Sequence, residues 1–194
     1  MPVVYMNGTN KFSYVEYAGN DIHLLTGPIV VYKPNKNVTV SLDFSRNRMR
    51  CLALDVLSLS ISYGLRVEKL KLSQNDLGVQ LVNDSDGKTF NVYRDLTELD
   101  ISFNGIKTLP LNIFNGLHYL RILNLSENSL RLIEFSISQM NKLSVLDLSY
   151  NLFSNISPST RKNMNKLTLI LNISLSLSGN SLSVVAIQFI FLNG

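Results

Sequence analysis

The chain contains little of what most metal sites, disulfide scaffolds and nucleophile-based enzymes require. Its one cysteine, Cys51, has no disulfide partner within the 194 residues. The single cysteine does not decide the compartment. The chain is either a protein of the reducing cytosol with a free thiol or a fragment whose partner cysteine lies elsewhere. The two histidines, His23 and His118, share no spacing with cysteines or carboxylates that would assemble a zinc site or an activated nucleophile. We therefore predict no enzymatic activity, no metal site and no cofactor.

Long apolar runs and a strong charge of one sign are also missing. The apolar run 184–192 has nine residues, and a membrane-spanning helix needs roughly 20. Residues 1–20 lack the basic start and apolar stretch of a signal peptide. The net charge is +4 and the basic residues are spread along the chain, so composition does not single out nucleic acid or an anionic membrane as a partner. With 45% hydrophobic and 16% charged residues, the chain has the composition of a folded domain.

What the sequence does contain is a repeat. The stretches "LTELDISFNGI" (96–106), "LRILNLSENSL" (120–130) and "LSVLDLSYNLF" (143–153) share the spacing Leu-x-x-Leu-x-Leu-x-x-Asn. Apolar residues occupy the positions five before, three before and two after every asparagine of this pattern, and a period in the twenties is typical of a solenoid. The intervals between successive asparagines vary in length, which indicates that insertions fall in the other half of each turn. These corner asparagines are Asn20, Asn47, Asn75, Asn104, Asn128, Asn151 and Asn180.

The constant part of the repeat predicts one short strand per turn. Its x-Leu-x-Leu-x core alternates between the two faces of a strand, and stacked strands of this kind form a parallel sheet along one side of a coil. The leucines then fill a continuous interior. An asparagine buried at the following bend must satisfy its amide, and we predict a ladder in which these amides bond to backbone groups of adjacent turns.

The passage "LTELDISFNGIKTLPLNIFNGLHYLRILNLSENSL" (96–130) resembles leucine-rich repeats of the extracellular type, and within them the ectodomains of Toll-like receptors. The resemblance implies an α/β leucine-rich repeat solenoid, or horseshoe, with a parallel β-sheet on its concave face and about seven repeats. We predict that residues 1–194 form one such array, that it is an uncapped internal fragment with poor solubility when expressed alone, and that 183–194 is a doubtful C-terminal tail.

The resemblance also carries expectations of function. It implies a ligand-binding ectodomain fragment of a receptor for innate immune recognition, which signals through parts outside this chain. Its partners would be a protein or microbial ligand and a second receptor in a homo- or heterodimer. It would lie on the extracellular face of the plasma membrane or in the endosome lumen, as part of a single-pass membrane receptor. The alternatives are a cell-surface or matrix adhesion scaffold and a cytosolic repeat adaptor.

Several residues are candidates for ligand contact. Basic side chains at Arg46, Arg48 and Arg50 would flank the sheet, and Lys69 and Lys71 would point outward from a strand. They could meet an acidic ligand or the phosphates of a nucleic acid, or they could form only a solvated surface. The outward aspartates and serines of the strands are read as part of the repeat scaffold.

Candidate N-glycosylation sites follow from the triplet Asn-x-Ser/Thr in loops, at Asn37, Asn83 and Asn155. The segment "NDSDGK" (83–88) has acidic residues and a glycine but lacks the later glutamate of a calcium loop, so we interpret it as a loop. Near the end of the chain, removal of 170–174 would make the last interval between corner asparagines equal to that between Asn104 and Asn128. We interpret the segment 170–174 as an insertion or as an error in the gene model.

Overall fold

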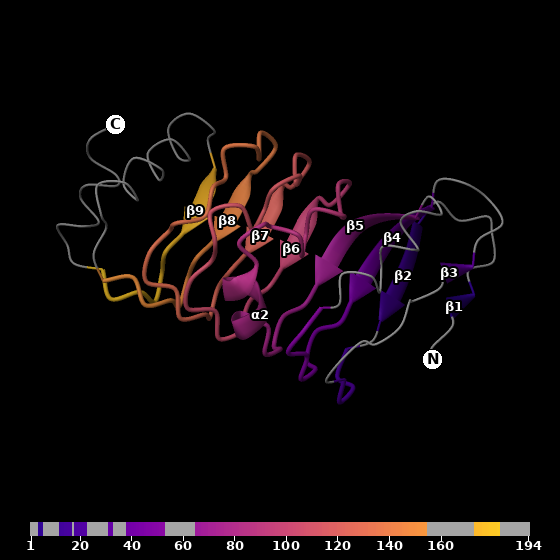
Figure 1. The fold of residues 1–194 in the computed structure, drawn as a ribbon, viewed down its shortest axis with the longest axis horizontal. Coiled ribbons are helices and arrows are strands. Elements are labelled where there is room, and N and C mark those ends of the chain that lie inside the picture. The colour runs from indigo at the N-terminus through magenta and orange to yellow at the C-terminus, as the bar shows by residue number, and fades with distance from the viewer. Residues whose placement is uncertain are drawn as a thin grey trace.

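A computed structural model describes residues 4–5, 12–16, 18–22, 31–32, 38–52, 65–154 and 173–182. Its main sheet has seven strands, all parallel, in the order β2-β4-β5-β6-β7-β8-β9. They lie side by side along the length of the molecule (Figure 1). The strands are β2 (Phe12–Glu16), β4 (Val38–Asp43), β5 (Leu65–Lys71), β6 (Glu98–Asp100), β7 (Ile122–Asn124), β8 (Val145–Asp147) and β9 (Ser174–Ser176).

The register of the sheet follows from the repeat. Leu70, Leu99, Leu123 and Leu146 stand opposite one another on neighbouring strands, and each is fully buried. A strand alternates its side chains between its two faces, so the residues on either side of these leucines point away from the core. Burial of each leucine side chain contributes about 2 kcal/mol relative to exposure. The predicted parallel sheet of a solenoid is therefore confirmed, and its place on a concave face stays a prediction.

The corner asparagines cross-link successive turns. Asn128 Oδ1 accepts the backbone N–H groups of Asn104 and Ile106, both at 3.0 Å. Its Nδ2 donates to the carbonyl of Leu125 in its own turn and to that of Ile101 in the turn before, at 3.0 and 3.1 Å. Only an amide both accepts and donates in this way. The Oδ1 atom also accepts the N–H two residues past the previous corner at Asn47, Asn75, Asn104, Asn151 and Asn180.

The residue before each corner asparagine adopts a left-handed backbone conformation. Its φ lies between 52° and 56° where it is not glycine, and it is 70° or 71° at the two outermost turns, where it is glycine. In the first six of these turns the N–H of this residue donates to the carbonyl of a serine in the following turn, so the hydrogen-bond ladder continues past the strand ends. The residues are Gly19, Arg46, Gln74, Phe103, Glu127, Tyr150 and Gly179.

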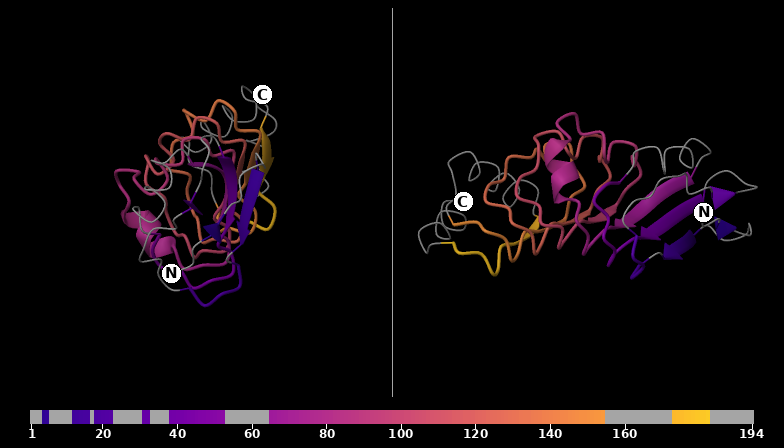
Figure 2. Two further views of the ribbon diagram at one scale, coloured as in Figure 1. Left: turned by 90° about the vertical axis from the view of Figure 1, so that its right-hand side faces the viewer. Right: turned by 60° about the horizontal axis from the view of Figure 1, so that its bottom comes forward.

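Among the described residues, the side of the array opposite the sheet is built from turns and one short helix, α2 (Gly78–Asn83), which lies away from the sheet (Figure 2). Phe90, Phe114 and Phe135 are buried beneath these turns. Phe114 stacks on Phe90 with ring centroids 6.1 Å apart, and it meets Phe135 edge-on at 5.3 Å. Hydrogen bonds join helix α2 to the previous turn of the array. The Gln80 amide accepts the N–H of Leu52, which follows β4, and donates to the carbonyl of the same residue.

Some sequence expectations remain predictions. The continuous stretch 65–154 carries four strands, β5 to β8, whereas most of the connections from β2 to β4, from β4 to β5 and from β8 to β9 fall outside the described residues. The count of seven full repeats, the single array over 1–194 and the tail at 183–194 are therefore untested. Of the suspected insertion at 170–174, Ile173 is buried and Ser174 begins β9; the rest of that segment is not described.

A second, two-stranded sheet was not anticipated. Its strands β1 (Val4–Tyr5) and β3 (Val31–Tyr32) pair in parallel, with Val4 opposite Val31. Both segments read "VY". Their separation along the chain equals that of the first two corner asparagines, Asn20 and Asn47, so this sheet keeps the period of the repeat.

Candidate functional site

The outward face of the sheet is the candidate recognition surface, and two rows of side chains cross it. One row runs through the first strand position before the buried leucine and the other through the first position after it. The first row contains Ser41, Lys69, Glu98, Ile122, Val145 and Ser174. The second row contains Asp43, Lys71, Asp100, Asn124, Asp147 and Ser176.

The carboxylates and amide of the second row are engaged by their own turns. Asp100 Oδ1 accepts the backbone N–H and the hydroxyl of Ser102, at 3.0 and 2.7 Å. Asn124 makes the same two bonds with Ser126, and Asp43 with Ser45. Asp147 Oδ1 accepts the N–H of Ser149 at 2.9 Å. These side chains hold the strand ends, which agrees with their interpretation as scaffold.

Lysine interrupts both rows on β5. Lys69 Nζ lies 2.8 Å from a carboxylate oxygen of Glu98 on the next strand. The hydrogen bond and negative charge of Glu98 raise the pKa of Lys69 above its ordinary value. Lys71 takes the place that an aspartate or asparagine holds on β4, β6, β7 and β8, and stands in register between Asp43 and Asp100. Both lysines are half-buried.

A hollow of about 290 Å³ lies beside the Lys69–Glu98 pair. Glu68, which β5 inserts as a bulge opposite β4, contributes to its lining together with Thr97 and Arg121. Ile122 closes it on β7 and is 38% exposed. This mixture of one apolar side chain and charges of both signs on a rigid sheet suits contact with a polar macromolecule rather than burial of a small apolar ligand.

The structure does not bring the three candidate arginines into this hollow. Arg46, Arg48 and Arg50 are exposed and alternate with the buried Asn47 and Met49 in the turn after β4. The Arg48 guanidinium lies 3.1 Å from a carboxylate oxygen of Asp21. Arg46 and Arg48 line one surface hollow with residues 19–21 and 47, whereas Arg50 lines another beside α2.

Of the candidate glycosylation sites, only Asn83 lies among the described residues; Asn37 and Asn155 lie outside them. Asn83 ends helix α2 and is exposed, as is Ser85, so the triplet is accessible. In the loop that follows, the Asp84 carboxylate accepts the backbone N–H groups of Lys88 and Thr89, and Asp86 pairs with Lys88 at 2.7 Å. The acidic side chains of this loop therefore serve its own conformation.

Within the described ranges, no three histidine, cysteine or acidic side chains converge as a metal-binding group. Within the same ranges, no helix has the length and apolar character needed to cross a bilayer.

Sequence reasoning missed one polar hollow, which Asn91, Arg94, Asn115, Gly116 and His118 line on the loops before β6 and β7. Its signal was present in the sequence. The segments "FNVYRDL" (90–96) and "FNGLHYL" (114–120) place asparagine after phenylalanine and a nitrogen-bearing ring or guanidinium three residues later. Of these segments, only Leu96 and Leu120 entered the repeat pattern.

Comparison with known proteins agrees with the architecture. Residues 94–153 match the family model described as leucine rich repeat. The chain is 31% identical over 178 residues to Toll-like receptor 4 of Pinctada imbricata, which is 92% of this chain and 19% of the receptor. It is also 31% identical over 135 residues to adenylate cyclase of Schizosaccharomyces pombe, which is 61% of this chain and 8% of the cyclase.

Tsukushi of Mus musculus is 35% identical over 136 residues, which is 68% of this chain and 36% of Tsukushi. Among solved structures, the functional domain of InlJ from Listeria monocytogenes is similar with a TM-score of 0.49 and 19% identity, over 80% of this chain and 31% of that one. The chain thus spans about a third or less of the length of each of these proteins.

Proposed function

Because this chain is a leucine-rich repeat protein, we propose that it is a ligand-binding segment of a Toll-like receptor ectodomain. The observation that supports this most is the similarity to the Pinctada imbricata receptor over 92% of the chain. The proposed role is recognition without catalysis, in which a microbial product or a protein contacts the outward face of the sheet. Innate immune signalling would then proceed through parts of the receptor outside this segment.

The physical support is preorganisation. Three features fix the backbone before any ligand arrives. They are the hydrogen bonds between aspartate or asparagine and serine at the strand ends, the amides of the corner asparagines, and the left-handed residues before those asparagines. A surface that is already ordered loses less conformational entropy on binding. The hollow beside the Lys69–Glu98 pair, with Arg121 and the exposed Ile122, is the part of this face that we propose contacts the ligand.

The proposal extends to partners and location. We propose a homo- or heterodimer of receptors on the extracellular face of the plasma membrane or in the endosome lumen, anchored by one membrane helix outside this segment. Catalysis is not carried over from the cyclase, since the match covers 8% of that enzyme. The arginine-rich turn keeps nucleic acid phosphate as an alternative ligand, whose binding would weaken as salt concentration rises.

The decisive experiment is to sequence the full-length transcript. We expect the reading frame downstream of residue 194 to encode further repeats, one membrane-spanning helix and a Toll/interleukin-receptor signalling domain. A stop codon after a matrix-type cysteine-rich cap would instead support the second candidate, a cell-surface or matrix scaffold. The similarity to Tsukushi over 68% of the chain is the observation that favours this candidate.

Glycan occupancy separates both of these candidates from a cytosolic adaptor, because only chains in the secretory pathway receive N-glycans. The native full-length protein would be treated with a glycosidase that removes N-glycans, and peptides containing Asn83 would be analysed by mass spectrometry. We expect Asn83 to be converted to aspartate by this treatment. Asn112, exposed but outside any Asn-x-Ser/Thr triplet, is the internal control. An unmodified Asn83 in a protein free of N-glycans would contradict the extracellular location.

A further inference from the structure

The polar hollow before β6 and β7 is built by two equivalent segments of neighbouring turns. Asn91 and Arg94 in one turn have their counterparts, Asn115 and His118, at the equivalent positions of the next. The buried phenylalanines that precede the asparagines, Phe90 and Phe114, stack on each other.

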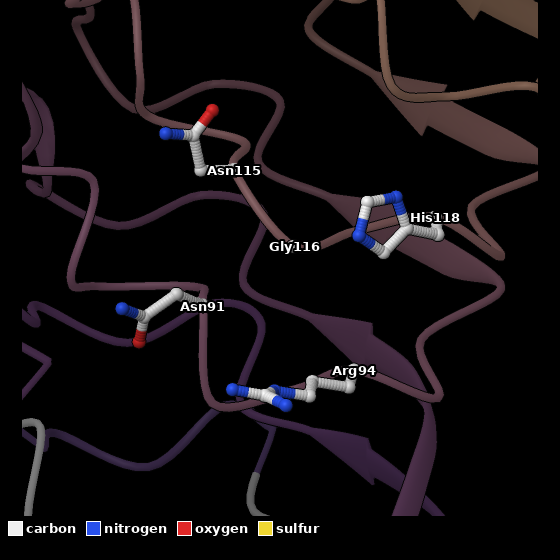
Figure 3. Close-up of a pocket in the computed structure, with 5 residues that line it drawn as sticks. All are labelled: Asn91, Arg94, Asn115, Gly116 and His118. Carbon is white, nitrogen blue, oxygen red and sulfur yellow. The ribbon is translucent and has the colours of Figure 1, made fainter.

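The hydrophobic residues anchor both loops to the core. Tyr93 and Leu117 are buried at equivalent positions directly before Arg94 and His118. Because the two loops are fixed in the same register, their polar side chains face a common space of about 280 Å³. Figure 3 shows Asn91 and Arg94 along one side of this space, and Asn115 and His118 along the other.

The lining is rich in hydrogen-bond donors. Arg94 supplies a positive charge and a planar set of N–H groups, and His118 presents an N–H in either protonation state. None of the described residues that line the hollow has a carboxylate. The nearest acidic residue in sequence, Asp95, faces Arg66 at 3.9 Å. Among its described lining residues, the hollow therefore offers no counter-ion for Arg94.

Gln139, in the following turn, bonds both Asn115 and Gly116. The Asn115 Oδ1 accepts a hydrogen bond from the Gln139 side chain at 3.4 Å, so its NH₂ group remains to donate. Gly116, whose N–H bonds the Gln139 Oε1 at 3.4 Å, adopts φ = 88°. A side chain at this position would be strained by the positive φ, although a Cβ would meet the Asn91 carbonyl oxygen at an ordinary 3.5 Å.

We propose that Asn91, Arg94, Asn115 and His118 form a binding subsite for an acidic saccharide. The guanidinium of Arg94 suits a carboxylate or sulfate group, which it can bind through two parallel hydrogen bonds. The adjacent hydroxyls suit the two asparagines, since the Asn91 amide offers both a donor and an acceptor and the Asn115 NH₂ group offers a donor. The subsite lies on the loops that lead into the strands and not on the outward sheet face. The saccharide proposal can therefore be wrong while the receptor assignment is right, and the receptor assignment can be wrong while the saccharide proposal is right.

The test measures binding of four probes to the full chain by isothermal titration calorimetry at low salt. The probes are a disaccharide with one glucuronate, a sulfated disaccharide, the neutral disaccharide cellobiose and inorganic sulfate. We expect both acidic disaccharides to bind at least about tenfold more tightly than cellobiose and than inorganic sulfate. Equal affinity for inorganic sulfate and the acidic disaccharides would overturn the saccharide assignment, because it would identify only a free oxyanion site.

Variants distinguish binding in this hollow from non-specific attraction of an acidic saccharide to basic residues elsewhere on the surface. Arg94→Gln and His118→Gln should each weaken binding of the acidic disaccharides about tenfold or more. The matched control, Arg131→Gln, removes a charge that is also exposed and does not line the hollow, and should leave affinity unchanged. Equal effects of Arg94→Gln and Arg131→Gln would overturn the proposal.

A measurement on the unmodified chain avoids any dependence on how the variants fold. In ¹⁵N-labelled protein, the acidic disaccharide should shift the side-chain amide signals of Asn91 and Asn115 and the backbone signal of Gly116. Shifts confined to the sheet residues 69, 98 and 122 would place the saccharide on the outward face and refute the subsite.

Discussion

At the scale of single residues, Asn128 shows how heavily a corner asparagine is bonded. Its side chain accepts two backbone N–H groups and donates to three carbonyls while only 7% exposed. Replacement by alanine leaves these backbone groups buried without partners. We expect Asn128→Ala to lower the free energy of unfolding by about 3–5 kcal/mol, as measured by urea denaturation.

The control for this prediction is Asn141→Ala, which alters an exposed asparagine in the turn before β8. A surface change of this kind should stay within about 0.5 kcal/mol. Equal losses in the two variants would mean that the amide ladder contributes little to stability and that burial of the leucines alone maintains the coil.

Tyr93 makes the stability of the fold sensitive to alkali. Its side chain is 1% exposed, and burial raises the pKa of its phenol well above the ordinary value. Below about pH 10 the phenol is protonated in both the folded and the unfolded chain. Above that, the unfolded chain releases this proton and the folded chain retains it, so the free energy of unfolding falls by about 1.4 kcal/mol per pH unit. This loss continues until the raised pKa is reached.

Tyr93→Phe should remove this contribution. Urea denaturation at pH 9 and pH 11 should show a smaller fall in stability for the variant than for the unmodified chain, by about 1 kcal/mol or more. Tyr119→Phe is the control, because Tyr119 is 58% exposed. A variant at position 93 that weakens in alkali as steeply as the unmodified chain would show that the phenol ionises without unfolding.

At the scale of elements, the turns opposite the sheet depend on the phenylalanines that stack between them. Phe114 contacts both Phe90 and Phe135 and is 2% exposed. Phe114→Ala should therefore destabilise the chain by about 3–5 kcal/mol in urea denaturation, whereas Leu111→Ala, at a side chain 60% exposed, should change stability by less than about 0.5 kcal/mol. A small loss at Phe114 would indicate that the loops repack around the gap.

The strands were predictable because their positions repeat with fixed spacing. Leu99, Leu123 and Leu146 sit five residues before a corner asparagine and pack in register, as alternation in a strand requires. The other half of each turn varies in length, so Phe135 joins the aromatic stack from a different offset than Phe114 does. Helix α2 was not predictable in this way, because it has no acidic residue in its first turn, no basic residue in its last turn and no side-chain N-cap.

The candidate site was less accessible to sequence reasoning for a related reason. That Lys69 and Lys71 point outward followed from the strand pattern, but the Lys69–Glu98 pair depends on the register between β5 and β6. A bulge at Glu68 shifts β5 against β4, and no local signal in the sequence marks it. The hollow before β6 and β7 is lined by polar residues at equivalent positions of two turns. A search for repeated apolar positions does not detect them.

At the scale of the whole molecule, each turn contacts mainly its two neighbours, since successive strands pair only with the next along the chain in the stretch from β4 to β9. Stability in such an array is approximately a sum of turn and interface terms. Removing 105–128 would delete one full turn, from just after one corner asparagine to the next, and join Asn104 to Ser129. Strands β6 and β8 would then become neighbours, and Phe135 would face Phe90.

Made in the full-length protein, this full-turn deletion should leave the array folded and melting cooperatively at a lower temperature than in the unmodified protein, as followed by circular dichroism. A deletion of 105–116, half as long, is the matched comparison. It would bring β7 into the chain about half a turn too early and move its leucines off the core side, so we expect no cooperative transition. The asparagine ladder and the packing of the buried leucines both require whole turns. Similar melting of the two deletions would therefore show that the array does not depend on the register of its turns.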